Sequence, residues 1–356
     1  MKKDRIILPL LAAAILFAAC SRVQVDRPDS EICFQMAKGG VILTKTEDYK
    51  ADYGSVPFGV YSWFKDQNSQ ESTSFMTNER VSYNSLHNVW TPQTTYYWPR
   101  GGSLDFICYS PYQADGPQIS EESITYTGIT AGTTDILYAD KQTGLTSNTN
   151  TYQFNGVPVL FRHALARVGF SLRLAYSEVC PDTGDRTKWE VILNSATLKG
   201  IHTTGDLSIV LDQTGAWKLP DSKIWTSNGT TTDYVIDCSA ITPFTSNDAQ
   251  ELGNSIFVLP QTLDQGQKLI LVFTIKTWHD TGNGYPEEPM ITETHVVIDA
   301  GLSIGILQRW GINQSIRYNL ILAPSRSITS ESPMEIHFDP SSTGWDNVTL
   351  STVLQL

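Results

Sequence analysis

Charged residues are scarce in this sequence, and beyond the first five positions its lysines and arginines do not cluster. Only 17% of the 356 residues are charged, and the formal net charge is -12. Because binding to a nucleic-acid backbone needs clustered Lys and Arg, we expect no nucleic-acid partner. The sequence also lacks a CxxC pair, a His/Cys cluster of the kind that holds zinc, and any cofactor motif. We therefore predict no metal and no organic cofactor.

The sequence has no stretch with the pattern of an amphipathic helix of four turns. Instead, short segments rich in β-branched and aromatic residues recur at roughly 8 to 12 residue intervals, separated by Gly, Pro, Asn and Ser. Hydrophobic residues make up 40% of the chain and aromatic residues 10%, which is enough for large cores. This pattern predicts an all-β protein of the sandwich type. Its length is comfortable for two such domains.

The N-terminus has the features of an export signal. Three basic residues in the first five positions precede an apolar run, Ile6–Ala19, that is too short to span a membrane securely. The run ends at Cys20, and the small residues before it resemble a bacterial lipobox, although Phe17 stands where Leu is commoner. We predict a signal peptide over residues 1–19 and lipidation of Cys20. An ordinary signal peptide with an incidental cysteine is the alternative.

The remaining cysteines number four, an even count that permits disulfides in an exported protein. They are spaced irregularly, and each lies in or beside an apolar, strand-like stretch. Two bridges and four buried thiols therefore remain equally open for Cys33, Cys108, Cys180 and Cys238.

The middle of the chain contains the most conspicuous alternation. Apolar residues fall at 157, 159 and 161, and again at 168, 170, 172 and 174. A period of two is typical of half-buried strands, so we predict a strand, a brief turn and a second strand that join two domains. The predicted order is a lipid-anchored tether over residues 20–30, an N-terminal sandwich over 31–157 and a C-terminal sandwich over 158–356. At the join, His163 is a candidate hinge or packing residue.

A GxSxG match and an isolated histidine are the two features that could support catalysis. Gly301–Gly305 matches GxSxG, but a nucleophile at Ser303 would need a following helix and a later acid and histidine. No helical pattern follows it, and His337 precedes Asp339. His163 has no carboxylate near it in the sequence. We predict that the protein is not an enzyme.

Two acidic segments have the pattern of surface loops and not that of a catalytic or calcium-binding site. Glu287 and Glu288 are flanked by prolines, which favours a solvated loop over a catalytic pair. The cluster Asp280–Gly284 lacks the ligand count of a calcium loop.

Four aromatic residues lie close together before the middle of the chain. Such residues could form a platform on which a sugar stacks, but more often they pack the core of a sandwich. The four are Trp90, Tyr96, Tyr97 and Trp98.

The end of the sequence alternates once more. Val348, Leu350, Leu354 and Leu356 share one parity, which Thr352 interrupts. The segment 348–356 is either the last strand of its own domain or a strand donated to the open sheet of a neighbour, where backbone hydrogen bonds and alternate side chains would hold it.

Several segments, weak singly but specific in their order, resemble the fimbrillin-like proteins of Bacteroides-type bacteria, which include the Mfa-like group and the subunits of type V pili. The Phe-x-His-Ala-Leu element beginning at Phe161 is the most specific. The segments are Phe58–Tyr61, Tyr97–Pro99, Leu104–Phe106, Tyr109–Pro111, Asp135–Ala139, Phe161–Phe170, Ala196–Ile201, Gly205–Leu207, Val258–Gln261, Tyr318–Leu322 and Gly344–Trp345.

The resemblance implies two tandem β-sandwich domains of transthyretin-like, Greek-key type, export as an outer-membrane lipoprotein, and assembly with other fimbrial subunits at the cell surface. In stalk subunits of the family, a trypsin-like protease removes the first strand, and the groove accepts a strand from the next subunit. Here the candidate first strand is Glu31–Met36. The arginines at 22 and 27 precede it and the next is Arg80, which leaves three candidate cleavage sites, Lys38, Lys45 and Lys50.

Three roles remain open. The leading hypothesis is a subunit that polymerises by strand exchange and supports adhesion, with 348–356 as the donor. The second is an uncleaved anchor or a tip adhesin, and the third is a surface glycan-binding lipoprotein. A host or bacterial surface ligand is a further candidate partner.

Overall fold

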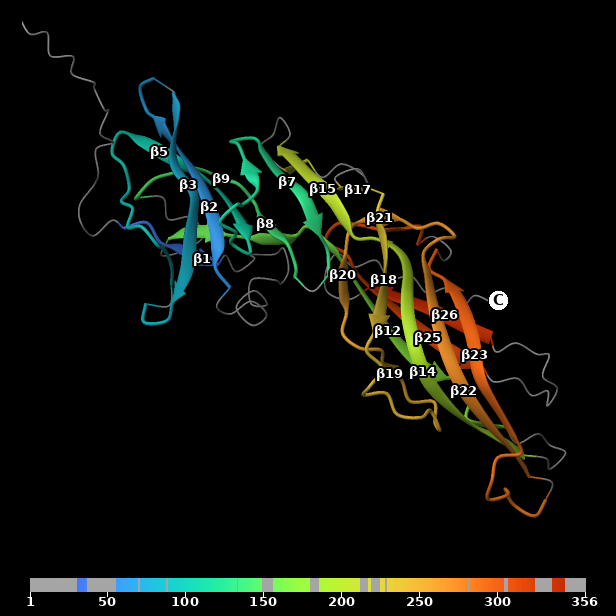
Figure 1. Cartoon of the computed structure of the whole chain (residues 1–356). Helices are drawn as coiled ribbons and strands as arrows, with labels where there is room; N and C mark the ends of the chain where they lie inside the picture. Colours follow the sequence, from blue (N-terminus) through green and yellow to red (C-terminus); the bar gives the residue numbers. More distant parts are fainter. Residues whose placement is uncertain are drawn as a thin grey trace, which may run out of the picture.

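The computed structural model describes residues 31–36, 56–69, 71–87, 89–132, 134–148, 156–179, 186–211, 217–218, 225–227, 229–280, 282–303, 307–323 and 335–342. The regular elements in these ranges are all β-strands, and they form two lobes (Figure 1). The predicted all-β class is therefore confirmed. Within the same ranges, no helix has the length and hydrophobicity that crossing a membrane would require.

The first lobe contains a nine-stranded sheet that curls on itself. Its end strands, β10 and β11, are consecutive in the chain with only Leu160 between them, so the chain itself closes the curl. Aromatic residues including Phe34, Phe58 and Phe106 form its core. The order is β10 (Val157–Val159), β1 (Phe34–Met36), β4 (Val89–Pro92), β3 (Ser72–Asn84), β2 (Phe58–Asp66), β5 (Gly102–Ser110), β8 (Leu137–Ala139) and β11 (Phe161–His163), with β9 (Gln142–Leu145) also paired to β5.

A second sheet packs against the first and draws on both halves of the chain. Its strands are β6 (Gln118–Ile119), β7 (Ser123–Thr130), β15 (Thr204–Leu211), β16 (Trp217–Lys218) and β17 (Trp225–Ser227). Ile124 and Tyr126 of β7 share one buried cluster with Leu207 and Ile209 of β15. The β7–β15 pairing thus crosses the domain boundary predicted at 157/158, which itself stays a prediction.

The second lobe consists of two sheets around the largest core. Leu269, Leu271, Phe273 and Ile275 alternate into that core, as the period-two pattern requires. One sheet contains β19 (Gln250–Glu251), β20 (Ile256–Val258), β12 (Ala166–Leu174), β25 (Ser315–Ala323) and β26 (Glu335–Ser342). The other contains β13 (Glu178–Val179), β18 (Thr231–Ile236), β14 (Arg186–His202), β22 (Lys268–Asp280) and β23 (Ile291–Gly301). A small ladder joins β21 (Gln261–Thr262) to β24 (Arg309–Trp310).

The segment 157–174 connects the lobes. Its strands β10 and β11 belong to the curled sheet, its buried turn is Ala164–Leu165, and β12 belongs to the second lobe. His163 is only 9% exposed, and its Nδ1 contacts Oδ2 of Asp135. His163 has no carboxylate near it in the sequence. Its partner, Asp135, lies 28 positions earlier in the chain. The contact lies at the turn between lobes, so His163 is a packing residue of the joint.

Candidate functional site

The first strand lies inside the curled sheet. Strand β1 runs parallel to β10 on one side and antiparallel to β4 on the other. The amide of Ile32 donates to the carbonyl of Tyr96 at 2.8 Å, and the amide of Val157 donates to the carbonyl of Cys33 at 2.8 Å. The segment around β1 therefore fills a slot, defined here as the space between β4 and β10, and both edges of the slot bind its backbone.

Two side chains of this segment anchor it in the core. Ile32 is 2% exposed and Phe34 is fully buried. The ring of Phe34 packs edge-on against Phe58 and Phe106, with centroid separations of 5.8 and 5.7 Å. Edge-to-face pairs add to the free energy gained by burial alone. The slot thus holds its occupant through alternate apolar side chains as well as backbone bonds.

The two edges of β10 differ in how they can pair with another strand. Gly156 has a φ of 141°, and a Cβ there would lie 2.6 Å from the carbonyl oxygen of Cys33, so only glycine permits this close approach. Because Val157 points its amide toward β1, Pro158 turns its missing N–H to the opposite edge. Proline on that edge discourages further strand addition. Strand β10 is therefore suited to pair a strand on its slot edge and unsuited to add one on its opposite edge.

This geometry permits strand exchange. If the first strand left, the facing backbone groups of β4 and β10 would lose their partners and the pocket of Phe34 would empty. Unpaired strand edges recruit other strands, and pockets at alternate positions select which strand fits. The slot is chemically a peptide-binding groove with its own occupant in place.

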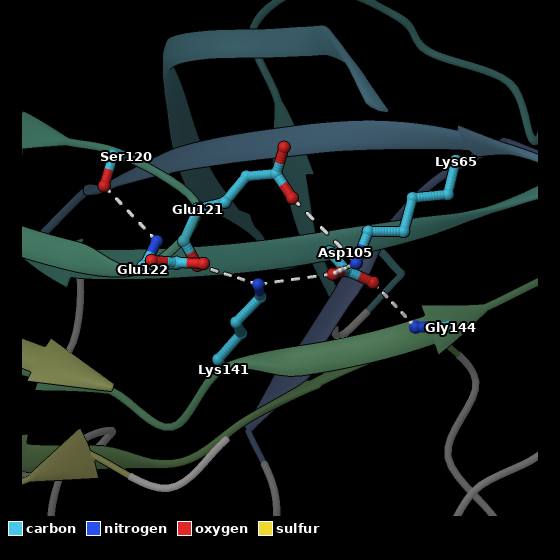
Figure 2. A network of polar contacts seen from close by, with 7 residues as sticks. All are labelled: Lys65, Asp105, Ser120, Glu121, Glu122, Lys141 and Gly144. Carbon is cyan, nitrogen blue, oxygen red and sulfur yellow. Dashed lines mark hydrogen bonds and ion pairs between the residues drawn. The ribbon is translucent and has the colours of Figure 1, made fainter. Parts of the chain in front are cut away.

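A charged cluster around the buried Asp105 of β5 stabilises the curled sheet (Figure 2). Oδ2 of Asp105 lies 2.7 Å from Nζ of Lys65 and 3.3 Å from Nζ of Lys141, and Oδ1 accepts the amide of Gly144 at 2.8 Å. Nζ of Lys141 also donates to the carbonyl of Glu121 at 2.8 Å. The cluster connects β2, β5 and β9 with the turn between β6 and β7.

The charges of this cluster shift each other's ionisation. Burial alone would raise the pKa of the Asp105 carboxyl, but the hydrogen bonds from Lys65 and Gly144 and the charges of the two lysines outweigh it, so the pKa lies below its ordinary value. The hydrogen bond to Asp105 raises the pKa of Lys65. Both groups are thus held in their charged forms, which suits a structural clamp.

The residues predicted for lipidation, protease cleavage and strand donation lie outside the described residues. The lipidation, cleavage and donor-strand predictions therefore stay predictions. These positions are Cys20, Lys38, Lys45, Lys50, Val348, Leu350, Leu354 and Leu356.

The predicted aromatic group belongs mainly to the core. Trp90 is 3% exposed and Trp98 is 9% exposed, and the partly buried Tyr96 donates its hydroxyl to Oε2 of Glu79 at 3.2 Å. The indoles of Trp90 and Trp98 therefore offer no exposed face to a sugar. Of the two interpretations of these aromatic residues, core packing is the one that fits the positions of Trp90 and Trp98.

The acidic and serine candidates fall in surface segments. Glu287 and Glu288 are exposed in the loop between β22 and β23, and Ser303 is exposed just after β23. Asp280 accepts the amides of Gly282 and Gly284 at 2.8 and 2.7 Å, so its carboxylate caps a turn. Among the described residues, no group of three or more His, Cys, Asp or Glu side chains is placed to hold a metal ion.

Asp105 and Asp135, whose carboxylates make buried polar contacts, are not among the residues predicted from the sequence. A charged residue within the apolar run Leu104–Tyr109 was a usable signal, because a buried charge needs a partner. The partners, Lys65 and Lys141, could not be identified without the strand pairing.

Comparison with known proteins gives a consistent result. A family model described as fimbrillin-like matches residues 45–335, well over half of the chain. No curated protein matches the chain. A fimbrial protein from Bacteroides vulgatus has a similar fold, with 15% identity, a TM-score of 0.53, and coverage of 88% of this chain and 99% of that one. For a candidate cell adhesion protein from Bacteroides uniformis, the identity is 15%, the TM-score 0.45, and the coverage 90% and 100%.

Proposed function

The chain belongs to the fimbrillin-like family, and from this premise we propose that it polymerises by exchanging its first strand for a strand of another subunit. Membership places it among fimbrial proteins of the cell surface that interact with other fimbrial subunits, and not among enzymes. The strand-exchange step and the lipid anchor are the parts that we propose.

The position of β1 carries the proposal. This strand is an interior member of the curled sheet, with β10 and β4 on its two sides. It is also the first strand of the described chain, and Lys38 follows its last residue by two positions. A single cut after Lys38, Lys45 or Lys50 would separate β1 from the rest of the chain without breaking any other described strand.

Removing β1 would leave β10 without its sheet partner. Among the described strands, β10 pairs with β1 alone, and its side chains Val157 and Val159 are buried. An incoming strand would regain the backbone bonds to both edges and fill the pockets of Ile32 and Phe34. The alternation of Val348, Leu350, Leu354 and Leu356 supports the tail of another copy as that strand.

We propose the following order of events. The chain is exported, lipidated at Cys20 and held at the outer membrane, with the slot closed by its own first strand. Proteolysis at one of the three lysines then releases the body from its anchor and opens the slot. The strand from a neighbouring subunit enters, so release and polymerisation are coupled.

Blocking the cut tests this order. In cells that display the protein, the triple substitution Lys38→Gln, Lys45→Gln and Lys50→Gln should leave a full-length, membrane-held chain and no fibres. Lys199→Gln, at an exposed lysine paired only loosely with Asp233 at 4.0 Å, is the control and should assemble normally. Normal fibres from the triple variant would contradict the proposal, and would favour an anchor or tip role that keeps the first strand.

A further inference from the structure

A pair of strands passes through both lobes. Strand β14 ends at His202 and β15 begins at Thr204, so a single residue separates a strand of the second lobe from a strand of the first. Antiparallel to them run β18 and β17. The pairing extends from Ala196↔Ile236 to Leu207↔Trp225, with a register shift between Leu198 and Ile201 and a break near Thr203. We call residues 196–207, 225–227 and 229–236 the brace.

Each end of the brace is built into a different sheet. On the edge away from β18, β14 pairs with β22 from Lys199 back to Arg186, within the second lobe. On the edge away from β17, β15 pairs with β7 from Thr204 to Val210, within the first lobe. Figure 1 shows β14 leading into β15 across the junction of the lobes. Each ladder lies within one lobe, so bending of the lobes against each other would have to occur between the two ladders, at Thr203.

The point where the brace changes sheets is tied from several directions. Thr203 is 5% exposed, its carbonyl accepts the amide of Ala131 at 2.8 Å, and its Oγ1 lies 3.3 Å from Oγ1 of Thr232. The hydroxyl of Tyr234 donates to the carbonyl of Ala131 at 3.2 Å. The crossing is thus hydrogen-bonded to the first lobe as well as to its own partner strand.

The side chain of Gln261 forms hydrogen bonds with the backbone amide and carbonyl of His202, the residue just before the crossing. Oε1 of Gln261 accepts the amide of His202 at 3.1 Å, and Nε2 donates to the carbonyls of His202 at 3.3 Å and Leu259 at 2.9 Å. Gln261 is 8% exposed, so water cannot readily replace these bonds. The side-chain amide of Gln261 thus makes the two backbone hydrogen bonds to His202 that a neighbouring strand would otherwise make.

Contacts outside the brace support the same junction. The indole Nε1 of Trp225 donates to the carbonyl of Ala164 at 2.7 Å, in the turn that joins β11 to β12. The amide of Phe257 donates to the carbonyl of Gly132 at 3.1 Å. The connection at Ala164 is therefore bonded to the brace, and the bond between Phe257 and Gly132 joins the two lobes at a separate point.

We infer that the brace, clamped by Gln261 at His202 beside the crossing, makes the two lobes a single rigid unit that unfolds cooperatively. The short connection at Ala164–Leu165 alone would act as a hinge. With the brace in place, the lobes keep one relative orientation.

Calorimetry of the purified, monomeric full chain tests the inference without any polymerisation, so its failure would leave the proposed strand exchange untouched. The unaltered protein should unfold in one transition. Gln261→Ala should divide this into two transitions, one for each lobe. The matched control is Gln250→Ala, because Gln250, on β19, makes three bonds to Thr242 that lie within the second lobe, and it should keep one transition.

Hydrogen exchange on the same proteins locates the effect. Gln261→Ala should speed exchange of the His202 and Ala131 amides by about tenfold or more, while amides in the middle of β22 change little. Two resolved transitions in the unaltered protein would overturn the inference, and so would unchanged exchange at His202 and Ala131. If Gln261→Ala does not fold, Gln261→Met, which keeps the side-chain length, serves the same test.

Discussion

Phe34 of the first strand packs edge-on against Phe58 of β2, with 5.8 Å between the ring centroids and both side chains fully buried. This contact ties the removable segment to the core. Replacing Phe34 with Ala should lower the free energy of unfolding of the intact chain by about 3–5 kcal/mol, the usual cost of emptying a buried aromatic site. Urea denaturation of the two proteins measures it.

Leu86→Ala is the control for this substitution. Leu86 is 89% exposed, so its truncation should change the free energy of unfolding by about 0.5 kcal/mol or less. If Phe34→Ala costs no more than Leu86→Ala, the first strand does not occupy the slot in solution.

The Asp105 cluster predicts a pH dependence. The folded pKa of Asp105 lies below its ordinary value of 3.8, so the carboxylate adds stability above that value and the addition is lost as pH falls through the folded pKa. Asp105→Asn should lower the free energy of unfolding at pH 7 by about 3 kcal/mol, because the side chain of Lys141, only 7% exposed, loses its charge partner. The variant should also lose less stability than the unaltered protein between pH 5 and pH 3.

Asp299→Asn controls for the charge change. Asp299 pairs with Lys268 at 2.8 Å, but both side chains are well exposed, at 48% and 38%. Exposed pairs contribute about 0–1 kcal/mol. Equal losses from the two variants would show that Asp105 is no buried clamp.

The sheet shared by the two halves predicts that the first half cannot fold alone. A chain ending at residue 165 lacks β15, so Ile124 and Tyr126 lose the cover of Leu207 and Ile209. We expect such a fragment to lack a cooperative thermal transition in near-ultraviolet circular dichroism, whereas the full chain shows one. A fragment with a sharp native transition would contradict the shared core.

Much of the fold could be predicted from local pattern. Alternation at Val168, Phe170 and Leu172 correctly indicated a strand, because a strand with one face in a core shows the same period in any sheet. The recurring short segments rich in β-branched and aromatic residues, together with the missing helical period, indicated the all-β class. These features depend on neighbours in the sequence.

What could not be predicted depends on pairing between distant segments. Nothing local to β15 indicates that it pairs with β7, about 80 positions earlier, while β14, one residue before it, pairs with β22. For the same reason the partners of Asp105 and His163 were invisible. The slot is similar: an alternating first strand was evident, but its interior position between β10 and β4 follows only from the topology.

The predicted donor strand can be tested by deletion. Removing residues 348–356 should abolish fibres on the cell surface but leave a monomer with the thermal stability of the full chain, because the donated strand is proposed to serve a neighbour. Electron microscopy of cells and melting of the purified monomer give the two results. Fibres that still form would exclude the tail as donor, and a strongly destabilised monomer would make it the last strand of its own domain.

N-terminal sequencing of subunits taken from intact surface fibres tests the central claim most directly. Strand exchange after removal of β1 predicts that assembled subunits begin between residues 39 and 51, immediately after Lys38, Lys45 or Lys50. Assembled subunits that still begin at a lipidated Cys20 would contradict it, because their first strand would remain attached and able to occupy its slot.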